Sequence, residues 1–114
     1  AQLRCRLEPP NLTSVIQLGS TVRHNVIMAV KEAIHNVIKH GAASEIQIRM
    51  EEAKGVFKIQ VNDNGRGFDP AATARGNGLD NMERRLRSLQ GSCSVESKLG
   101  GGTMVTLVFP LPVS

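Results

Sequence analysis

The sequence predicts an α+β domain, a two-layer α/β sandwich in which helices cover one face of a mixed, mostly antiparallel sheet. Two stretches repeat apolar residues every three or four positions, as helices do, and five shorter stretches read as strands. Their order is strand, helix, strand, strand, helix, strand, strand. Helices and a sheet that each bury one face against the other give this architecture.

Length and composition limit what the chain can be. Its 114 residues suit a single domain, residues 1–114, with one sizeable core. Three Phe and no Trp or Tyr argue against single-stranded nucleic-acid binding, which uses aromatic platforms. The net charge of +4 suits a polyanionic ligand, and the basic trio Arg84, Arg85 and Arg87 is typical of a solvated helix face. We therefore expect no nucleic-acid partner.

Cysteine usage and hydropathy bear on the compartment. Cys5 and Cys93 form no C-x-x-C pair, so we expect two free, buried thiols in a reducing environment. Signal-peptide features and membrane-spanning apolar runs are both missing from the sequence. The chain starts at Ala1, without a Met, in a strand-like segment. We interpret it as a fragment of a larger cytoplasmic protein, with no direct membrane contact by this domain.

The first half of the chain predicts one strand and one long helix. Residues 2–7 alternate in character and end at Pro9-Pro10, and residues 21–39 form the helix. Ser20 or Thr21 can cap the start of this helix, and Gly41 stands where a left-handed C-terminal residue is wanted. The apolar stripe of the helix comprises Val22, Val26, Val30, Ala33 and Val37, widened by Ile27, Ile34 and Ile38.

The second half predicts four strands, a long polar loop and a second helix. Residues 46–50 and 57–61 alternate as strands, and Lys54-Gly55 between them is a hairpin turn. Residues 63–77 are too polar for a core, and a loop of this length is usually functional. Residues 79–89 form a helix that Gly91 ends, with Leu79, Met82, Leu86 and Leu89 on one face. Strands at 92–97 and 103–109, separated by three glycines, close the chain.

The long helix carries one polar constellation, Glu32, Asn36, Lys39 and His40. At about 100° per residue these four fall within an arc of roughly 100°, beside the apolar stripe. Asn36 offers an oxygen to a hard cation such as Mg²⁺, and Glu32 could orient or deprotonate an attacking group. Taken alone, the pattern is more typical of a solvated helix face.

A second constellation, Asp63-Asn64-Gly65-Arg66-Gly67-Phe68, follows a predicted strand directly. Gly65 and Gly67 permit a tight turn and the close approach of a planar ligand. Asp63, at the strand end, can accept a hydrogen bond from an exocyclic amine such as N6 of adenine. Asn-Gly alone indicates a hairpin, but residues 69–72 supply no second strand, which weakens that interpretation.

Two further glycine-rich segments are weak signals by themselves. Gly76-Asn77-Gly78-Leu79 opens the second helix, where bare backbone N–H groups can bind phosphate. It matches neither the Walker P-loop nor the dinucleotide-binding pattern. Gly100-Gly101-Gly102 precedes Thr103 and reads as a flexible turn, so only the neighbouring motifs make Thr103 of interest.

Together, in this order, the motifs are specific. EAIHNVIKH, DNGRGF, GNGLDNMERR and GGGT resemble the ATP-binding fold, of Bergerat type, that is shared by histidine kinases, gyrase, mismatch-repair and heat-shock ATPases. The resemblance extends from about Arg4 to Pro110. The leading Glu and the G-x-G-L-x-x-M-x-x-R stretch look most like sensor histidine kinases that pair with LuxR-type response regulators. The short segment before Gly76, without a separate Phe-bearing box, also occurs there, whereas Gln90 stands where that subfamily often has glycine.

The resemblance implies a role for each matching position. Asn36 matches the Mg²⁺ ligand, and Glu32 matches a general base or polarising carboxylate. Asp63 matches the aspartate that recognises adenine. The other matches are Lys39 and His40 near the phosphates, Gly65 and Gly67 around adenine, Gly76, Asn77, Gly78 and Leu79 at the end of the ATP lid, and Thr103 beside the base.

The resemblance also implies partners. ATP and Mg²⁺ would bind here, and the γ-phosphoryl group would pass to a histidine on a dimerisation domain N-terminal to Ala1. A response regulator would act downstream. None of His24, His35 or His40 suits the acceptor role, so the isolated fragment should not autophosphorylate. Two alternatives stay open: an anti-sigma-factor-type serine kinase with the same fold, and an interaction module that has lost nucleotide.

Overall fold

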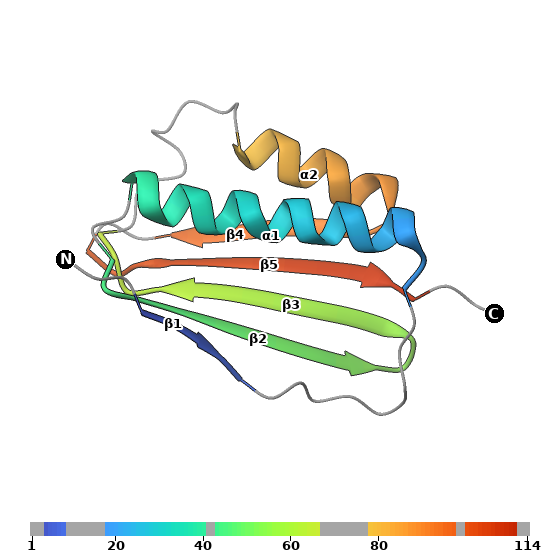
Figure 1. Ribbon diagram of the computed structural model, residues 1–114, viewed down its shortest axis with the longest axis horizontal. Coiled ribbons are helices and arrows are strands. Elements are labelled where there is room, and N and C mark those ends of the chain that lie inside the picture. The colour runs from blue at the N-terminus through green and yellow to red at the C-terminus, as the bar shows by residue number, and fades with distance from the viewer. Residues whose placement is uncertain (1–3, 9–17, 41–42, 67–77, 98–99, 112–114) are drawn as a thin grey trace.

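The computed structural model describes residues 4–8, 18–40, 43–66, 78–97 and 100–111. Within these ranges two helices lie on one face of a five-stranded sheet, as the sequence predicts (Figure 1). The strands are ordered β1-β2-β3-β5-β4, with β1 parallel to β2 and the other neighbours antiparallel. The elements are β1 (Arg4–Leu7), α1 (Ser20–His40), β2 (Glu45–Ala53), β3 (Val56–Asp63), α2 (Gly78–Ser88), β4 (Ser92–Ser97) and β5 (Thr103–Pro110).

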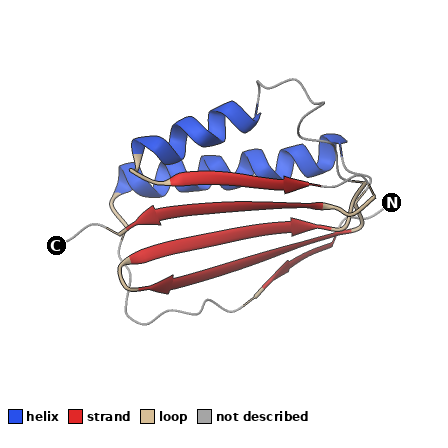
Figure 2. Cartoon of the chain, turned by 180° about the vertical axis from the view of Figure 1, so that it is seen from behind, coloured by secondary structure: helices blue, strands red, loops and turns tan. Residues whose placement is uncertain are grey.

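The core lies between the helices and the sheet. Alternate residues of β2, β3 and β5 point toward the helices, and the rings of Phe57 and Phe109 stack at a centroid distance of 5.4 Å. Ala29 and Ala33, at 0% and 1% exposure, let α1 approach the sheet closely. The buried apolar set is Val26, Ala29, Ala33, Val37, Ile46, Ile48, Phe57, Ile59, Val61, Met82, Leu86, Val105, Leu107 and Phe109. The other face of the sheet carries no helix among the described residues (Figure 2).

The apolar stripe of α1 is narrower than predicted. Ile27 and Ile38 are 48% and 65% exposed, so the widening of the stripe by these two residues is wrong, although Ile34 does pack against the core. The expectation of two buried thiols is also wrong. Cys5 is exposed because β1 is an edge strand with all four residues exposed, and Cys93 is only half-buried.

The turns show how local backbone geometry sets the element ends. Lys54 and Gly55 both have positive φ, 56° and 78°, which confirms the hairpin and makes its turn type I′. The helix α1 begins at Ser20, and its first hydrogen bond runs from Arg23 N–H to the Gly19 carbonyl. Gly19 therefore holds the capping position, and the expected cap from Ser20 or Thr21 is wrong.

The end of α2 is a Schellman motif. Gly91 N–H donates to the Leu86 carbonyl at 2.7 Å, and Gln90 N–H donates to the Arg87 carbonyl at 3.0 Å. Gln90, with φ of 61°, takes the left-handed position that glycine usually fills. Gly91 is needed for a different reason, since a β-carbon there would lie 2.1 Å from the carbonyl oxygen of Val108. The prediction that Gly91 ends this helix is thus confirmed, with Gln90 bearing the positive φ.

Several element ends meet at one end of the molecule. There α1 and β3 finish while β2 and β5 begin, at the left of Figure 1, and α2 begins farther to the right. Segments separated by more than sixty positions along the chain, such as the last turn of α1 and the start of β5, thereby come to the same end of the fold. No helix in the described part of the chain is long and apolar enough to cross a membrane.

Candidate functional site

Asp63 and Thr103 are paired at the end of the sheet where these elements meet. Asp63 is the last residue of β3, Thr103 is the first of β5, and the two are register partners. The next residues on the same face, Val61 and Val105, belong to the buried core. Because side chains alternate along a strand, Asp63 and Thr103 point to the helix side of the sheet. Asp63 and Thr103 thus extend, with polar side chains, the row of β3 and β5 residues that faces the core.

The surroundings of Asp63 prepare its carboxylate to accept a hydrogen bond. Burial raises the pKa of Asp63 above its ordinary value, while hydrogen bonds from the backbone of Gly65 and Thr103 act in the lowering direction. Gly65 N–H donates to Oδ1 at 2.8 Å. A carboxylate offers about four lone-pair sites, so two backbone bonds leave capacity for a ligand N–H. The group is a partly dehydrated, oriented acceptor.

A glycine turn packs against the backbone of Asp63. Gly102 has φ of 77°, and a β-carbon on it would lie 2.3 Å from the Asp63 carbonyl oxygen. Gly100, with φ of 79°, donates its N–H to the Arg66 carbonyl. These contacts join the turn before β5 to the turn after β3. The glycine run therefore has a defined structural role and is more than a flexible turn.

Thr103 is oriented by β4. Its Oγ1 lies 2.7 Å from Ser97 Oγ, which also donates to the Gly102 carbonyl at 3.2 Å. A hollow of about 340 Å³ opens beside this pair, a size within the range of ligand pockets. Its described lining is Asn62, Asp63, Glu96, Ser97, Gly101, Gly102, Thr103 and Met104. Asn36 is not part of that lining. Because Asn62, Glu96 and Met104 alternate with Asp63, Ser97 and Thr103, the hollow includes the open face of the sheet.

The helix α1 contributes the other predicted residues of the candidate site. Glu32 and Asn36 are both half-buried and stand one turn apart, next to the buried Ala33 and Val37. This matches the prediction that they border the apolar stripe. The two side chains lie in the second half of α1, the half that ends beside the tip of β3 (Figure 1).

Part of the predicted site lies outside the described residues. Gly67, Gly76 and Asn77 belong to that part, and the side chains of Lys39, His40 and Leu79 do too. Gly78 is described as the first residue of α2, so the predicted junction between glycine loop and helix is confirmed at that residue.

The donor set on α1 is compatible with Mg²⁺. The cation prefers oxygen ligands, and it usually takes one or two from the protein and the rest from water and substrate phosphates. Asn36 offers an amide oxygen at a half-buried position, with the half-buried Glu32 carboxylate one turn away. Within the described ranges, no group of three His, Cys, Asp or Glu side chains could hold a metal by itself. A cation here would therefore depend on the polyphosphate for most of its coordination.

Sequence reasoning missed Asn64 and Gly102. From the sequence, Asn64 is half of an Asn-Gly turn signal, yet its side chain makes three hydrogen bonds to the start of β2. From the sequence, Gly102 is only part of a flexible run, yet its close approach to Asp63 excludes any side chain. The adjacent position of Asn64 to Asp63 was the available signal for the first residue. No local sequence signal marks Gly102, because Asp63, which it contacts, lies at the end of a strand distant in the sequence.

Comparison with known proteins agrees with the fold and with the order of the motifs. Residues 21–113 match the family described as "Histidine kinase-, DNA gyrase B-, and HSP90-like ATPase". The signal transduction histidine-protein kinase/phosphatase DegS of Brevibacillus brevis is 35% identical over 83 residues, covering 72% of this chain and 22% of that protein. DegS of Bacillus subtilis is 35% identical over 85 residues, covering 71% of this chain and 22% of that protein.

A solved structure shows the same architecture. The ATP binding domain of PrrB from Mycobacterium tuberculosis superimposes with a TM-score of 0.78 at 28% identity. The match covers 97% of this chain and 82% of that domain. In contrast, the chain spans only 22% of the length of the two curated relatives. The likeness therefore concerns one domain of those longer proteins.

Proposed function

Because this chain belongs to the family of histidine kinase-, DNA gyrase B- and HSP90-like ATPases, we propose that it binds Mg·ATP and donates the γ-phosphoryl group to a histidine on a separate dimerisation domain. It would act as the catalytic domain, residues 1–114, of a two-component sensor histidine kinase. The relatives named as histidine-protein kinases, 35% identical, support the choice of kinase over the other activities of the family.

The observation that carries this proposal is the placement of Asp63. An oriented carboxylate acceptor, paired with Thr103 on the helix side of the sheet, suits the N6 amino group of adenine. Guanine carries an oxygen acceptor at the same ring position, which a carboxylate would repel. Gly65 and Gly67 would shape the pocket for the ring, and Thr103 would hold the base from the opposite strand.

The phosphate end of the nucleotide would lie toward α1 and α2. Asn36 would bind Mg²⁺, which neutralises charge on the β- and γ-phosphates when bound. Lys39 and His40 would contact the phosphates, and Gly76, Asn77, Gly78 and Leu79 would offer backbone N–H groups at the start of α2. Glu32 would orient the attacking imidazole and hold its proton in the correct place.

Phosphoryl transfer at this site balances simply. An imidazole nitrogen of the acceptor forms a bond to the γ-phosphorus, the bond from the γ-phosphorus to the bridging oxygen breaks, ADP leaves with that electron pair, and the imidazole releases one proton. The protein mainly positions the partners and neutralises charge, so a domain without an acceptor of its own is sufficient for this half of the reaction. We propose a response regulator of the LuxR type as the next acceptor, on the basis of the G-x-G-L-x-x-M-x-x-R stretch at α2. We propose a cytoplasmic location for the domain, because the reaction draws on ATP.

The test is a titration followed by transfer. The chain is titrated with ATP, ADP and GTP, with and without Mg²⁺, and then mixed with radiolabelled ATP and a helical dimerisation domain bearing a histidine. We expect adenine nucleotides to bind with micromolar to millimolar Kd, as enzyme substrates usually do, and label to appear on the acceptor as acid-labile phosphohistidine. Label on a serine would instead identify an anti-sigma-factor-type kinase. The absence of nucleotide binding would contradict the proposal.

A further inference from the structure

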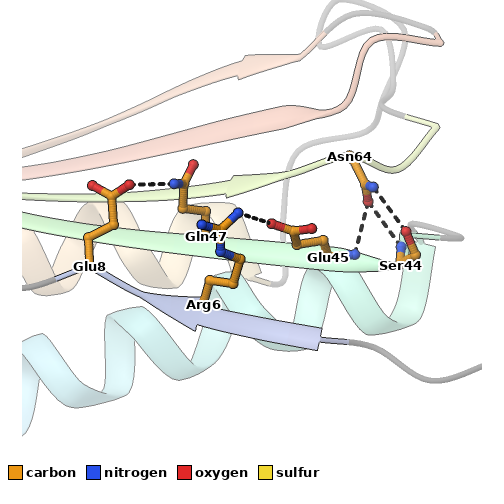
Figure 3. Close-up of polar contacts among 6 residues, drawn as sticks. All are labelled: Arg6, Glu8, Ser44, Glu45, Gln47 and Asn64. Carbon is orange, nitrogen blue, oxygen red and sulfur yellow. Dashed lines mark hydrogen bonds and ion pairs between the residues drawn. The ribbon is translucent and has the colours of Figure 1, made fainter.

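Asn64 connects the end of β3 to the start of β2 through its side chain. Its Oδ1 accepts hydrogen bonds from the backbone N–H groups of Ser44 and Glu45, each at 3.0 Å. Its Nδ2 donates to Ser44 Oγ, also at 3.0 Å (Figure 3). One amide thus satisfies two backbone donors and one hydroxyl.

This clamp begins where the backbone ladder stops. The last register pair of β2 and β3 is Ile46 with Asp63, and beyond it the Asn64 N–H reaches the Glu45 carbonyl only at 3.3 Å. The side chain of Asn64 replaces the ladder bonds that would come next. Ser44 is held from its other side as well, since its carbonyl accepts from Arg4 N–H of β1 at 2.9 Å. Asn64 is therefore hydrogen-bonded to a residue that is itself held by β1.

Ser44, which Asn64 holds, lies between α1 and β2 in the chain. Ser44 follows the last residue of α1, His40, by four positions, and Asn64 follows Asp63 by one. The clamp consequently ties the turn after β3 to the residues that begin β2. It also anchors the neighbours of Asn64: Gly65, which orients the Asp63 carboxylate, and Arg66, whose carbonyl accepts from Gly100.

From these contacts we propose that Asn64 is a positioning residue that fixes Asp63 for the discrimination of adenine from guanine. The inference rests on the proposed function, in which Asp63 meets the adenine amino group. Hydrogen-bond discrimination requires the carboxylate to be held within about 0.5 Å, and such precision comes from supporting groups around the contacting residue. Without the clamp, the turn that holds Gly65 can shift, and Asp63 loses its fixed direction.

The contacts of Asn64 favour a role in specificity over one in stability. Its side-chain hydrogen bonds are solvent-exposed, and Asn64 contributes nothing to the buried apolar set. An exposed hydrogen bond adds little to the free energy of unfolding, because water replaces it when it is lost. A change at Asn64 should therefore alter the ratio of the ATP and GTP dissociation constants more than it alters the melting temperature.

The experiment compares Kd for ATP and for GTP by calorimetry in a small variant set, together with thermal unfolding. Asn64→Ala removes the clamp, Ser44→Ala removes only its hydroxyl partner, and Asn64→Asp keeps an acceptor for both N–H groups. Gln47→Ala is the matched control, because it removes an amide of β2 on the sheet's open face that donates to Glu8 (Figure 3). Asp63→Ala provides the reference for full loss of adenine recognition.

We expect the preference for ATP over GTP to fall about tenfold, equivalent to one good hydrogen bond, in Asn64→Ala, and by a smaller factor in Ser44→Ala. Asn64→Asp and Gln47→Ala should keep the preference of the parent. If Asn64→Ala keeps it while Asp63→Ala loses it, the positioning role is wrong and the proposed function stands. If Asp63→Ala keeps it too, the adenine assignment itself fails. Should Asn64→Ala not fold, an unchanged preference in Ser44→Ala overturns the inference.

Discussion

Gly102 lies so close to Asp63 that a β-carbon on residue 102 would be 2.3 Å from the Asp63 carbonyl oxygen. This contact joins the turn before β5 to the end of β3, at the residue whose carboxylate we assign to adenine. The relationship has no equivalent in the local sequence, where three consecutive glycines indicate only a turn. It also yields a sharp test, because Gly100 in the same turn has a similar φ with nothing within 4 Å.

Gly102→Ala should destabilise the domain strongly. The substitution places Ala in a left-handed conformation, which costs roughly 1–2 kcal/mol, and adds a clash that forces β3 and β5 apart. Gly100→Ala should show the conformational cost alone. Urea unfolding of both variants measures the difference. Equal losses in the two variants would mean that the contact with Asp63 has no energetic consequence.

Asp63→Asn should stabilise the fold at neutral pH while weakening ATP binding. The pKa of Asp63 is raised by burial above its ordinary 3.8, so the folded state holds the proton more tightly than the unfolded chain does. The contribution of Asp63 to the free energy of unfolding is therefore present at low pH. It is lost as pH rises from 3.8 through the raised pKa of the folded state. Asn carries no charge and should remove this decline. Free energies of unfolding from pH 3 to 7 test it, and identical pH profiles for parent and variant would contradict it.

The same titration predicts how ATP binding depends on pH. Protonation of Asp63 removes the acceptor for the adenine amino group, so affinity for ATP should fall as pH decreases through the raised pKa. Calorimetry at a series of pH values, with Asp63→Asn as the reference, measures this. The fall should be missing from the variant, and a fall of equal size in both proteins would assign it to another group.

Asn36→Ala should remove most of the Mg²⁺ dependence of ATP binding. Loss of a group that supports a metal site typically costs 10–100-fold, so we expect the gain in affinity on adding Mg²⁺ to shrink by about tenfold. His35→Ala is the matched control, because His35 is the preceding residue of α1 and is exposed. The measurement is ATP affinity with Mg²⁺ and with EDTA. A variant that gains as much from Mg²⁺ as the His35→Ala control would exclude Asn36 as a ligand.

Gln90→Gly should stabilise the domain without altering nucleotide binding. Gln90 has φ of 61° in the Schellman motif at the end of α2, a conformation that costs a side-chain-bearing residue about 1 kcal/mol. Glycine removes that cost but is more flexible in the unfolded chain, so the net gain should be roughly 0.5 kcal/mol. Chemical unfolding measures the gain. A loss of stability would show that Gln90 makes contacts that outweigh its backbone strain.

The fold was largely accessible from the sequence. Apolar periodicity located both helices, and Lys54-Gly55 located the β2–β3 hairpin, because these signals are local and repeat over many residues. The exposure of Ile27 and Ile38 was not accessible in the same way. Which flank of a helix faces the sheet depends on where the second helix packs. Periodicity gives the width of an apolar stripe but not the neighbours that cover it.

The motifs of the candidate site could be found in the sequence, but their positions relative to one another in space could not. The sequence separates Asp63 from Thr103 by a helix and a strand, and only the antiparallel register of β3 and β5 makes them partners. The clamp from Asn64 to Ser44 depends on the end of another register, that of β2 and β3. Such pairings are set by long-range sheet topology. The chemical roles assigned to the site residues stay predictions until nucleotide binding is measured.

The central claim is that one nucleotide is held by two parts of the fold, its base by the β3–β5 end and its phosphates by α1. Amide NMR spectra of the labelled chain test this most directly, with adenosine and Mg·ATP added in turn. We predict that adenosine shifts the resonances of Gly65 and Thr103 but not the side-chain amide of Asn36, and that Mg·ATP shifts all three. Shifts confined to the open face of the sheet, with Gly65, Thr103 and Asn36 unchanged, would contradict the account.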